Sequence, residues 1–470
     1  MVPFCKTGGL ADVAGALPAE IVKALPGSRV VCFLPRYKAV DAALHGLKKI
    51  PFALEIPVGD RTETARFLIH KAGKVETVFL DHPGYFGRPG IYGEGGSDYP
   101  DSAERYAFFC RAALEYCGKA KFAPAVIHCH DWQTGLIPAY LKTLYAKDAS
   151  FKKTRSVFTI HNMAYQGNFP KESLPLTGLP WSVFTPDKLE FFGFMSYLKA
   201  GLVFADRITT VSPRYSREIR TDPRFGCGME GLLARRAKSL SGILNGLDVD
   251  AWDPSKDPMI ESNYSVKSKD LLTAKAECKL GLQARARLAP VKDAPLIGMV
   301  TRLDPQKGFK MLLQILPKMA AEHPKSQWAV LGSGLPEIEK ELELQAGRFP
   351  GRFFFHKGFD EPLAHQIYAG ADIFLMPSEY EPCGLGQMIS MRYGTVPVVT
   401  PTGGLADTVG PDTGFVCAET SAPALHQALW KALKAFEDRT LWSRLMRRGM
   451  MKDFSWKTSA RKYAELYKHG

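Results

Sequence analysis

The sequence predicts an α/β protein built from two Rossmann-like, doubly wound parallel-sheet domains. Short, continuously apolar runs alternate with segments of helical periodicity through both halves of the chain. Apolar runs of this kind are typical of parallel strands that helices cover on both faces. A length of 470 residues leaves room for two or three domains, and the two sets of alternating runs indicate two.

Five strands are expected in each half. In the first half they are Val30–Leu34, Val75–Leu80, Ala125–Cys129, Ser156–Ile160 and Arg207–Val211. In the second half they are Leu296–Val300, Trp328–Leu331, Phe353–His356, Ile373–Met376 and Val396–Thr400. Segments of helical period separate them, for example Asp101–Tyr116 and Thr134–Ala146.

A turn-rich stretch that begins at Asn245-Gly246 marks the boundary between the domains. The predicted N-terminal domain therefore spans residues 1–245, and the C-terminal domain spans residues 246–454. In doubly wound sheets, ligands bind at the carboxyl ends of the strands. The residues that directly follow each strand are therefore the candidates for a functional site.

Composition excludes several classes of protein. Hydrophobic residues make up 46% and charged residues 23% of the chain, so a disordered or collagen-like chain is excluded. The nine cysteines are scattered and form no CxxC pair, which is typical of a reducing compartment. No apolar run approaches the ~18 residues of a membrane span, and no secretory signal core precedes Lys6. We therefore expect a cytoplasmic protein without a membrane partner.

The chain carries 61 Lys and Arg against 48 Asp and Glu, a formal net charge of +13. Residues 1–245 hold 32 basic and 22 acidic side chains, so most of the excess lies in this half. Its densest part, between Arg207 and Lys238, interleaves arginines with acidic residues, which is typical of a solvated helical surface. We therefore expect no nucleic-acid partner, and strongly salt-dependent binding of DNA or RNA would contradict this expectation.

One hexapeptide, TGGLAD, occurs twice, at Thr7–Asp12 and at Thr402–Asp407, each time before a helical pattern. Adjacent glycines at a helix start let backbone N–H groups approach a phosphate, or they merely permit a tight turn. Lys6 beside the first copy favours an anion there. A phosphate loop follows a strand, yet only five residues precede Lys6, so the first strand of this domain is expected to be missing.

Polar side chains follow two strands of the first half. His130 and Asp131 end one strand, and His161 and Asn162 follow the next. Imidazole, carboxylate and amide groups at the carboxyl ends of strands in one sheet are placed to share a polar ligand. A metal hydrolase is the competing interpretation of His-x-His-Asp at residues 128–131. No companion HxxH or HxxxH pattern supplies further ligands, so no metal is expected.

Strand ends of the second half carry cations and a carboxylate. Arg302 and Lys307 lie on the loop after Leu296–Val300, and a guanidinium with an ammonium is a common way to hold a diphosphate. Glu381 follows Ile373–Met376, and its carboxylate can accept hydrogen bonds from sugar hydroxyls. The glycines after Glu381 can offer N–H groups to phosphate. The alternative role for a glutamate here is to complement a helix dipole.

Together these segments resemble bacterial glycogen synthases and plant starch synthases. The matching motifs, in chain order, are Lys6–Val13, His130–Trp132, His161-Asn162, Asn245–Asp248, Arg302 with Lys307-Gly308, Glu381–Leu385 and Thr402–Leu405. Each motif alone is weak, but the ordered set spans nearly the whole chain and is specific. The resemblance implies the GT-B glycosyltransferase architecture, with the active site in the cleft between the domains. It also implies that residues 455–470 form a helix that crosses back to the first domain.

The function that the resemblance implies is transfer of glucose from ADP-glucose to the non-reducing end of an α-1,4-glucan such as glycogen, with retention of configuration. Neither a metal nor another cofactor is implied. The residues that would act in catalysis are Asp131, His161, Glu381, Lys307 and Arg302. Those that would bind substrate are Lys6, Gly8, Gly9, Asp12, Asn162, Asn245, Phe359, Cys383, Gly384, Leu385 and Gly386. Lys6, Arg302 and Lys307 would hold the diphosphate, and Phe359 would cover the adenine.

Two residues depart from the family's pattern. Gly386 stands where threonine is common, which removes one hydroxyl contact to phosphate, and Phe359 stands where tyrosine is common. The alternatives to the implied function are a related glycosyltransferase that uses UDP-glucose or another acceptor, and a catalytically silent glucan-binding protein. A phosphorylase would need a lysine-bearing segment for pyridoxal phosphate, which the sequence does not suggest.

Overall fold

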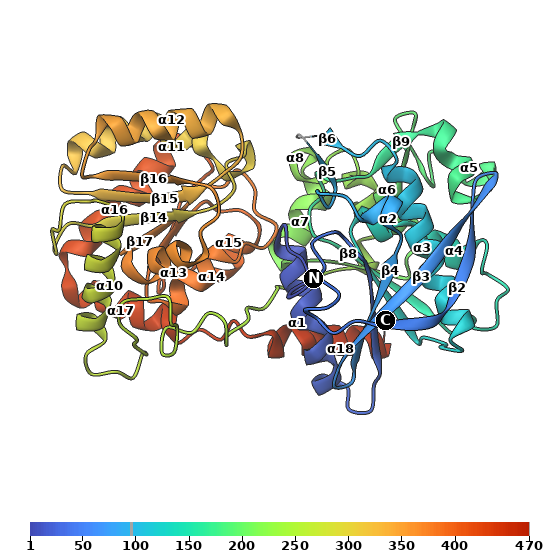
Figure 1. The fold of residues 1–470 in the computed structure, drawn as a ribbon. Helices are drawn as coiled ribbons and strands as arrows, with labels where there is room; N and C mark the ends of the chain where they lie inside the picture. The colour runs from blue at the N-terminus through green and yellow to red at the C-terminus, as the bar shows by residue number, and fades with distance from the viewer. Residues whose placement is uncertain (95–96, 470) are drawn as a thin grey trace. The chain divides into compact units, whose positions relative to one another are not determined.

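The structure is a computed structural model that describes residues 1–94 and 97–469. The chain divides into two compact units, one formed by Met1–Gly246 with Trp456–Gly470 and the other by Leu247–Ser455. Each unit contains a parallel sheet with helices packed against it, so the predicted fold class of two Rossmann-like α/β domains is confirmed (Figure 1). No helix in the described part of the chain is long and apolar enough to cross a membrane.

The second unit is built on one six-stranded sheet. Its strand order is β16-β15-β14-β17-β18-β19, and each neighbouring pair is parallel. The strands are β14 (Leu296–Val300), β15 (Gln327–Gly332), β16 (Phe353–Lys357), β17 (Ile373–Met376), β18 (Val396–Val399) and β19 (Phe415–Val416). All five strands predicted for this half are therefore confirmed, and the short β19 adds an edge strand.

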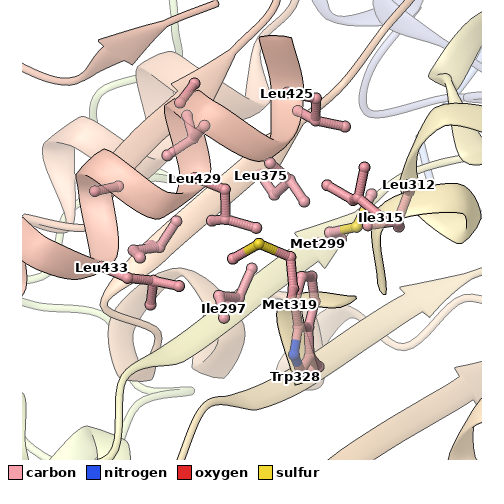
Figure 2. Packing of buried hydrophobic residues seen from close by; sticks show 14 of the residues in the cluster. Ile297, Met299, Leu312, Ile315, Met319, Trp328, Leu375, Leu425, Leu429 and Leu433 are labelled. Atoms are coloured by element: carbon pink, nitrogen blue, oxygen red, sulfur yellow. The ribbon is translucent and has the colours of Figure 1, made fainter. Parts of the chain in front are cut away.

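Helices of the second unit bury the apolar faces of this sheet. They are α10 (Leu271–Arg285), α11 (Phe309–Glu322), α12 (Pro336–Arg348), α13 (Glu361–Gly370), α14 (Gly386–Arg392), α15 (Gly403–Thr408), α16 (Ala422–Glu437) and α17 (Arg439–Met450), with a short 3₁₀ helix at Pro305–Lys307. Figure 2 shows Met299 of β14 packed among Leu312 of α11 and Leu429 of α16. Burial of a side chain of this size contributes roughly 1.5–3 kcal/mol. This core holds the strand ends in fixed positions.

The first unit contains two four-stranded sheets. One has the order β13-β12-β8-β7 and is parallel throughout. The other has the order β1-β4-β3-β2, in which only β1 and β4 are parallel. The strands are β1 (Val30–Pro35), β2 (Lys48–Val58), β3 (Arg61–Ala72), β4 (Val75–Asp81), β7 (Val126–His130), β8 (Arg155–Ile160), β12 (Arg207–Thr210) and β13 (Leu240–Gly242). The five strands predicted for this half are confirmed, whereas the hairpin β2–β3 was not foreseen.

The remaining elements of the first unit are shorter. Its small strands are β5 (Gly93–Glu94), β6 (Ser97–Asp98), β9 (Asn168–Pro170), β10 (Glu190–Phe191) and β11 (Phe194–Ser196). Its helices are α1 (Gly9–Ala24), α2 (Pro83–Phe86), α3 (Ser102–Lys119), α4 (Leu136–Lys142), α5 (Leu174–Thr177), α6 (Tyr197–Phe204), α7 (Pro213–Thr221), α8 (Pro223–Gly226), α9 (Glu230–Arg235) and α18 (Trp456–His469). Short 3₁₀ helices cover Trp132–Thr134, Lys171–Ser173, Trp181–Val183 and Ala237–Ser239.

Helices from opposite ends of the chain pack together in the first unit. Val13 and Leu17 of α1 share a core with Trp456 and Tyr463 of α18. The hydroxyl of Ser459 on α18 also donates a hydrogen bond to the backbone oxygen of Leu244. Among the described residues no strand precedes α1, and residues 2–4 form a turn. The C-terminal helix is therefore part of the first unit.

Three arginines of the arginine-rich stretch are held by neighbouring groups of this unit. Arg214 pairs with Glu218 at 2.9 Å, and Arg224 pairs with Asp222 at 2.6 Å. The guanidinium of Arg236 donates to the backbone oxygens of residues 202, 203 and 205 at 2.7–2.8 Å. These arginines therefore serve the local fold.

Candidate functional site

The loops at the carboxyl edge of the six-stranded sheet are hydrogen-bonded to one another. The loop after β14 meets the loop after β15 where Leu303 N donates to Ser333 O at 2.9 Å. It meets the loop after β17 where Glu379 N donates to Gln306 O at 2.8 Å. Most of the site residues predicted for the second half of the chain lie on these loops. The backbone hydrogen bonds between the loops bring these residues together.

Lys307 and Glu381 form a mostly buried ion pair at this edge. The Nζ atom of Lys307 lies 2.6 Å from Oε2 of Glu381, and the hydroxyl of Ser378 donates to the same oxygen at 3.1 Å. The two side chains are only 14% and 9% exposed. A buried carboxylate is costly unless it is paired and hydrogen-bonded, and this one is both. The pair therefore holds both groups in place at the strand ends.

The loop that carries Glu381 packs on the second copy of the TGGLAD repeat. Gly404 N donates to Glu381 O at 3.1 Å. A Cβ on Gly404 would lie 2.0 Å from the oxygen of Cys383, and one on Gly403 would lie 2.0 Å from that of Glu381. Only glycine permits an approach this close. The glycines of the second copy therefore serve to position the Glu381 loop.

The residues that follow Glu381 are closely packed as well. Cys383 is buried, and its backbone oxygen accepts a hydrogen bond from the Gln387 side chain at 3.1 Å. Gly384 has a φ of +68°, which favours glycine. A Cβ on Gly386 would lie 2.9 Å from the ring of Phe374, so the threonine common at this position would not fit without movement of that ring. Leu385 directly precedes α14 and is half-buried.

Arg302, on the same loop as Lys307, and Phe359, on the loop after β16, are more exposed to solvent. The guanidinium of Arg302 lies 3.2 Å from Asp304, and its side chain is 54% exposed. Phe359 is 85% exposed and follows Gly358, whose N–H donates to Gly332 O at 3.0 Å. An exposed aromatic side chain is available to stack on a flat ligand group.

In the first unit, Asp131 links the ends of β7 and β8. Its Oδ1 accepts a hydrogen bond from the backbone N–H of His161 at 2.7 Å. Its φ of +55° is uncommon for a residue other than glycine, and such strain tends to occur at functional sites. Burial raises the pKa of Asp131 to about 7, although the backbone N–H groups of His161 and Asn162 oppose this shift.

His161 and Asn162 lie on the short loop after β8. Nε2 of His161 lies 3.0 Å from Nδ1 of His130, and burial lowers the pKa of both rings. The side-chain oxygen of Asn162 accepts a hydrogen bond from Ala164 N at 3.0 Å, which holds the loop in a turn. The predicted residues Asp131, His161 and Asn162 are thus brought together at one edge of the parallel sheet.

The glycines of the first copy of the repeat have open space around them, whereas those of the second copy are closely packed. A Cβ on Gly8 or Gly9 would meet no atom within 4 Å, and no side chain caps α1. Lys6 lies beside this helix start, with its Nζ 2.8 Å from Oδ1 of Asp12. An exposed ion pair of this kind contributes at most about 1 kcal/mol, so Lys6 can exchange Asp12 for another anion. These features suit an anion-binding helix start.

Fourteen buried side-chain polar atoms lack a hydrogen-bond partner among the described residues, and two of them belong to the motifs considered above. These two are Oδ1 of Asn245, which is 6% exposed, and Oγ1 of Thr402, which is 2% exposed. Unpaired buried groups are rare in native proteins, and a ligand is one explanation. Asn245 was predicted from the sequence. Thr402 was not among the predicted site residues, although it opens the second copy of the repeat.

Ser378 entered the site only through the structure, whereas His130 was already grouped by the sequence with Asp131, His161 and Asn162 at the strand ends. Ser378 precedes Glu381 by three positions and is buried beneath it. His130 is part of the His-x-His-Asp motif, for which a metal hydrolase was the competing interpretation. No group of three or more His, Cys, Asp or Glu side chains in the described part of the chain is arranged to hold a metal. The imidazole of His130 instead contacts His161.

Matches with protein families and curated relatives cover both units. A family model described as "Starch synthase catalytic domain" matches residues 1–235, and one described as "Glycosyl transferases group 1" matches residues 283–447. A glycogen synthase of Elusimicrobium minutum is 47% identical over 99% of this chain and 97% of its own length. A glycogen synthase of Anaeromyxobacter dehalogenans (strain 2CP-C) is 47% identical over 100% of this chain and 97% of its own length.

Solved structures give a consistent result. The catalytic domain of starch synthase IV from Arabidopsis thaliana, bound to ADP and acarbose, has a TM-score of 0.89 at 32% sequence identity. That match covers 100% of this chain and 97% of the plant domain. Sucrose-phosphate synthase from Thermosynechococcus elongatus has a TM-score of 0.60 at 19% identity, over 98% of this chain and 93% of that one, which shows the fold alone.

Proposed function

The chain is a glycosyltransferase that belongs to the glycogen and starch synthase family, and we propose that it transfers glucose from ADP-glucose to the non-reducing end of an α-1,4-glucan. The observation that carries this proposal is the Lys307–Glu381 pair, which sets a cation suited to hold phosphate beside a carboxylate suited to accept hydrogen bonds from sugar hydroxyls. The related starch synthase IV was solved with ADP, which supports ADP as the nucleotide. The names of the bacterial relatives support glycogen as the acceptor.

We assign the diphosphate to cations and backbone N–H groups. Lys307, Arg302 and Lys6 supply positive charge, and the open start of α1 at Gly8-Gly9 supplies N–H donors. Groups of this kind stabilise the negative charge that develops on a departing phosphate. On this assignment no metal or other cofactor is required, because the side chains and the helix start already neutralise the diphosphate.

We assign the transferred glucose to Asp131, His161, Asn162, Asn245 and Glu381. The oxygens of Asp131 and Glu381 are suited to accept hydrogen bonds from sugar hydroxyls and to stabilise positive charge on the ring. Oδ1 of Asn245, which has no partner among the described residues, is suited to the same task. Phe359 is assigned to the adenine, since its exposed ring can stack on it.

The reaction we propose retains the anomeric configuration. The bond between the anomeric carbon of glucose and the phosphate oxygen breaks first, and ADP takes the electron pair. The acceptor hydroxyl then bonds to that carbon from the face that ADP has left, and its proton passes to the departing phosphate. No enzyme carboxylate forms a covalent intermediate in this scheme, in contrast to a retaining glycosidase.

The test compares two donors with one acceptor. The full chain is incubated with glycogen and with ADP-glucose or UDP-glucose, each labelled in the glucose, and label in precipitated glucan is measured together with released nucleotide. We expect label in glycogen and stoichiometric ADP from the first donor. Faster transfer from UDP-glucose would overturn the donor assignment, and nucleotide release without labelled glycogen would overturn the acceptor. Lys307→Ala serves as the inactive control.

A further inference from the structure

Three histidine rings stand in a row beside the residues assigned to glucose. His128 and His130 occupy alternate positions of β7, so their side chains leave the strand on the same face. Their ring centroids are 4.1 Å apart, and those of His130 and His161 are 5.3 Å apart. The row therefore runs from His128 through His130 to His161 at the end of β8.

The outer end of the row is anchored on the C-terminal helix. Nδ1 of His128 lies 2.7 Å from the hydroxyl of Tyr467 on α18, and its Nε2 lies 2.6 Å from the hydroxyl of Thr159. Arg155 also donates to the backbone oxygen of Tyr467 at 2.5 Å. Both ring nitrogens of His128 have hydrogen-bond partners, so this ring has a structural role. It provides a fixed surface against which the His130 ring packs.

The inner end of the row has one engaged nitrogen and one open nitrogen. Nε2 of His161 lies 3.0 Å from Nδ1 of His130. Among the described residues, Nδ1 of His161 has no hydrogen-bond partner, so it is available to a ligand. Nδ1 of His130, in contrast, is engaged by Nε2 of His161. The contact between the two rings consequently determines which hydrogen-bonding group His161 presents.

The protonation states of the two rings limit the hydrogen bonds that His130 and His161 can form with each other. Burial lowers the pKa of His130 to about 4 and that of His161 well below its ordinary value, so both rings are neutral near pH 7. A neutral imidazole carries a single N–H, and the contact between two such rings needs one N–H and one lone pair. If His161 donates from Nε2, its Nδ1 is a bare acceptor. If His130 donates instead, Nδ1 of His161 carries the proton.

An unprotonated Nδ1 of His161 suits the reaction better than a protonated one. A sugar ring that loses its leaving group becomes positive, and an N–H dipole aimed at it would oppose that charge, whereas a lone pair would stabilise it. We propose that His130 is a positioning residue for the glucosyl transfer: its Nδ1 accepts the Nε2–H of His161, which orients that ring and leaves Nδ1 of His161 as an acceptor toward the sugar. The proposal rests on the proposed function, in which His161 faces the transferred glucose.

Two substitutions at position 130 separate positioning from packing. His130→Leu keeps an apolar side chain of similar bulk but removes the acceptor. His130→Asn places a carboxamide oxygen near the position of Nδ1, so it can accept the same hydrogen bond. The matched control is His70→Leu, since His70 is a half-buried histidine of the same unit whose Nδ1 lies 3.0 Å from the backbone oxygen of His45. Thermal unfolding of each variant establishes that it is folded.

Kinetics give the first readout. We expect His130→Leu to lower kcat by about 10- to 100-fold with the KM for the glucosyl donor within about two-fold, because a misplaced ring affects the transition state more than binding. His130→Asn is expected to recover most of the loss, and His70→Leu to keep the wild-type kcat. Wild-type kcat in His130→Leu would overturn the proposal, and so would an equal loss in the leucine and asparagine variants.

Nitrogen-15 NMR of histidine-labelled protein gives the second readout and needs no substrate. We expect the His161 ring of the wild-type chain to carry its proton on Nε2 at pH 7.5, to keep this tautomer in His130→Asn and to lose it in His130→Leu. A proton on Nδ1 in the wild-type chain would overturn the proposal. If the wild-type chain transferred no glucose, the proposed function would fail, while the tautomer of His161 would still be read from the spectra.

Discussion

The ammonium of Lys307 and the carboxylate of Glu381 lie 2.6 Å apart although 74 positions separate them in the chain. The contact joins the loop after β14 to the loop after β17. The hydroxyl of Ser378 donates a hydrogen bond to the same carboxylate oxygen. Each group thus holds the other in place before any substrate arrives. Preorganised charge of this kind needs little rearrangement during the reaction, which is the main source of electrostatic catalysis.

Removal of one partner is expected to cost stability as well as activity. Lys307→Met leaves the Glu381 carboxylate buried without its cation, and we expect the free energy of unfolding to fall by about 3 kcal/mol. The double variant Lys307→Met with Glu381→Gln should recover most of this loss, because no charge is left unpaired. Urea unfolding followed by tryptophan fluorescence measures both. Equal stabilities of the single and double variants would show that an unpaired Glu381 carboxylate is not the cause of the loss.

The two copies of the TGGLAD repeat are expected to respond differently to one added methyl group. Gly404→Ala sets a Cβ against the oxygen of Cys383, so we expect a fall of several degrees in the melting temperature. Gly9→Ala meets open space in a helix, so the melting temperature should stay equal or rise slightly. The KM for ADP-glucose should rise in Gly9→Ala, because the methyl group shields the N–H donors. Identical melting temperatures in the two variants would contradict this division of roles.

The raised pKa of Asp131 predicts a pH dependence. The carboxyl is neutral below about pH 7 and ionised above it, so we expect kcat to fall as the pH drops through about 7. Asp131→Asn should lower kcat at pH 8 and remove this limb of the profile. Since the pKa in the folded state lies above the unfolded value, burial of the neutral form favours folding fully below about pH 4, and this advantage is lost as the pH rises through about 7.

The same linkage predicts the stability of the Asp131→Asn variant. Its melting temperature relative to the wild-type chain should rise as the pH increases from 4 to 8, because asparagine never acquires the buried charge. Calorimetry at several pH values measures the difference. A difference that stays constant with pH would show that Asp131 titrates near its ordinary pKa.

Substitution of Phe359 tests nucleotide recognition without affecting the stability of the fold. Its side chain is 85% exposed, so Phe359→Ala should leave the melting temperature unchanged. Loss of a stacking ring is expected to weaken ADP binding by about 1–2 kcal/mol, or about 5- to 30-fold, as measured by calorimetric titration. Phe359→Tyr keeps the ring and should bind ADP as the wild-type chain does. Unchanged affinity in Phe359→Ala would remove the adenine assignment.

The framework of the fold was predictable because its strands are buried on both faces. Runs such as Leu296–Val300 and Ile373–Met376 were found with their observed bounds, since a continuous apolar run between helical patterns has few other interpretations. The hairpin of β2 and β3 was missed although Phe52, Leu54 and Ile56 alternate with less apolar residues. Its partly exposed strands give a weaker signal than the buried ones. The helix expected at Thr134–Ala146 is limited to Leu136–Lys142.

The site was predictable in its residues and much less in its contacts. Strand-end position identified Asp131, His161 and Glu381, because the carboxyl edge of a parallel sheet collects ligand-binding groups. The hydrogen bond from Gly404 to Glu381 and the contact between His130 and His161 depend on the pairing of distant segments, which local pattern does not reveal. The two identical hexapeptides show this most clearly, since one is open and the other is packed.

The most direct test of the proposed transfer follows the acceptor itself. The full chain is incubated with maltohexaose and ADP-glucose, and the products are separated by length and examined by proton NMR. We predict maltooligosaccharides one or more glucose units longer, joined by α-1,4 linkages, with one ADP formed for each unit added. Glu381→Gln is the control and should yield almost none. Products without α-1,4 linkages, or ADP formed with no elongated product, would contradict the account.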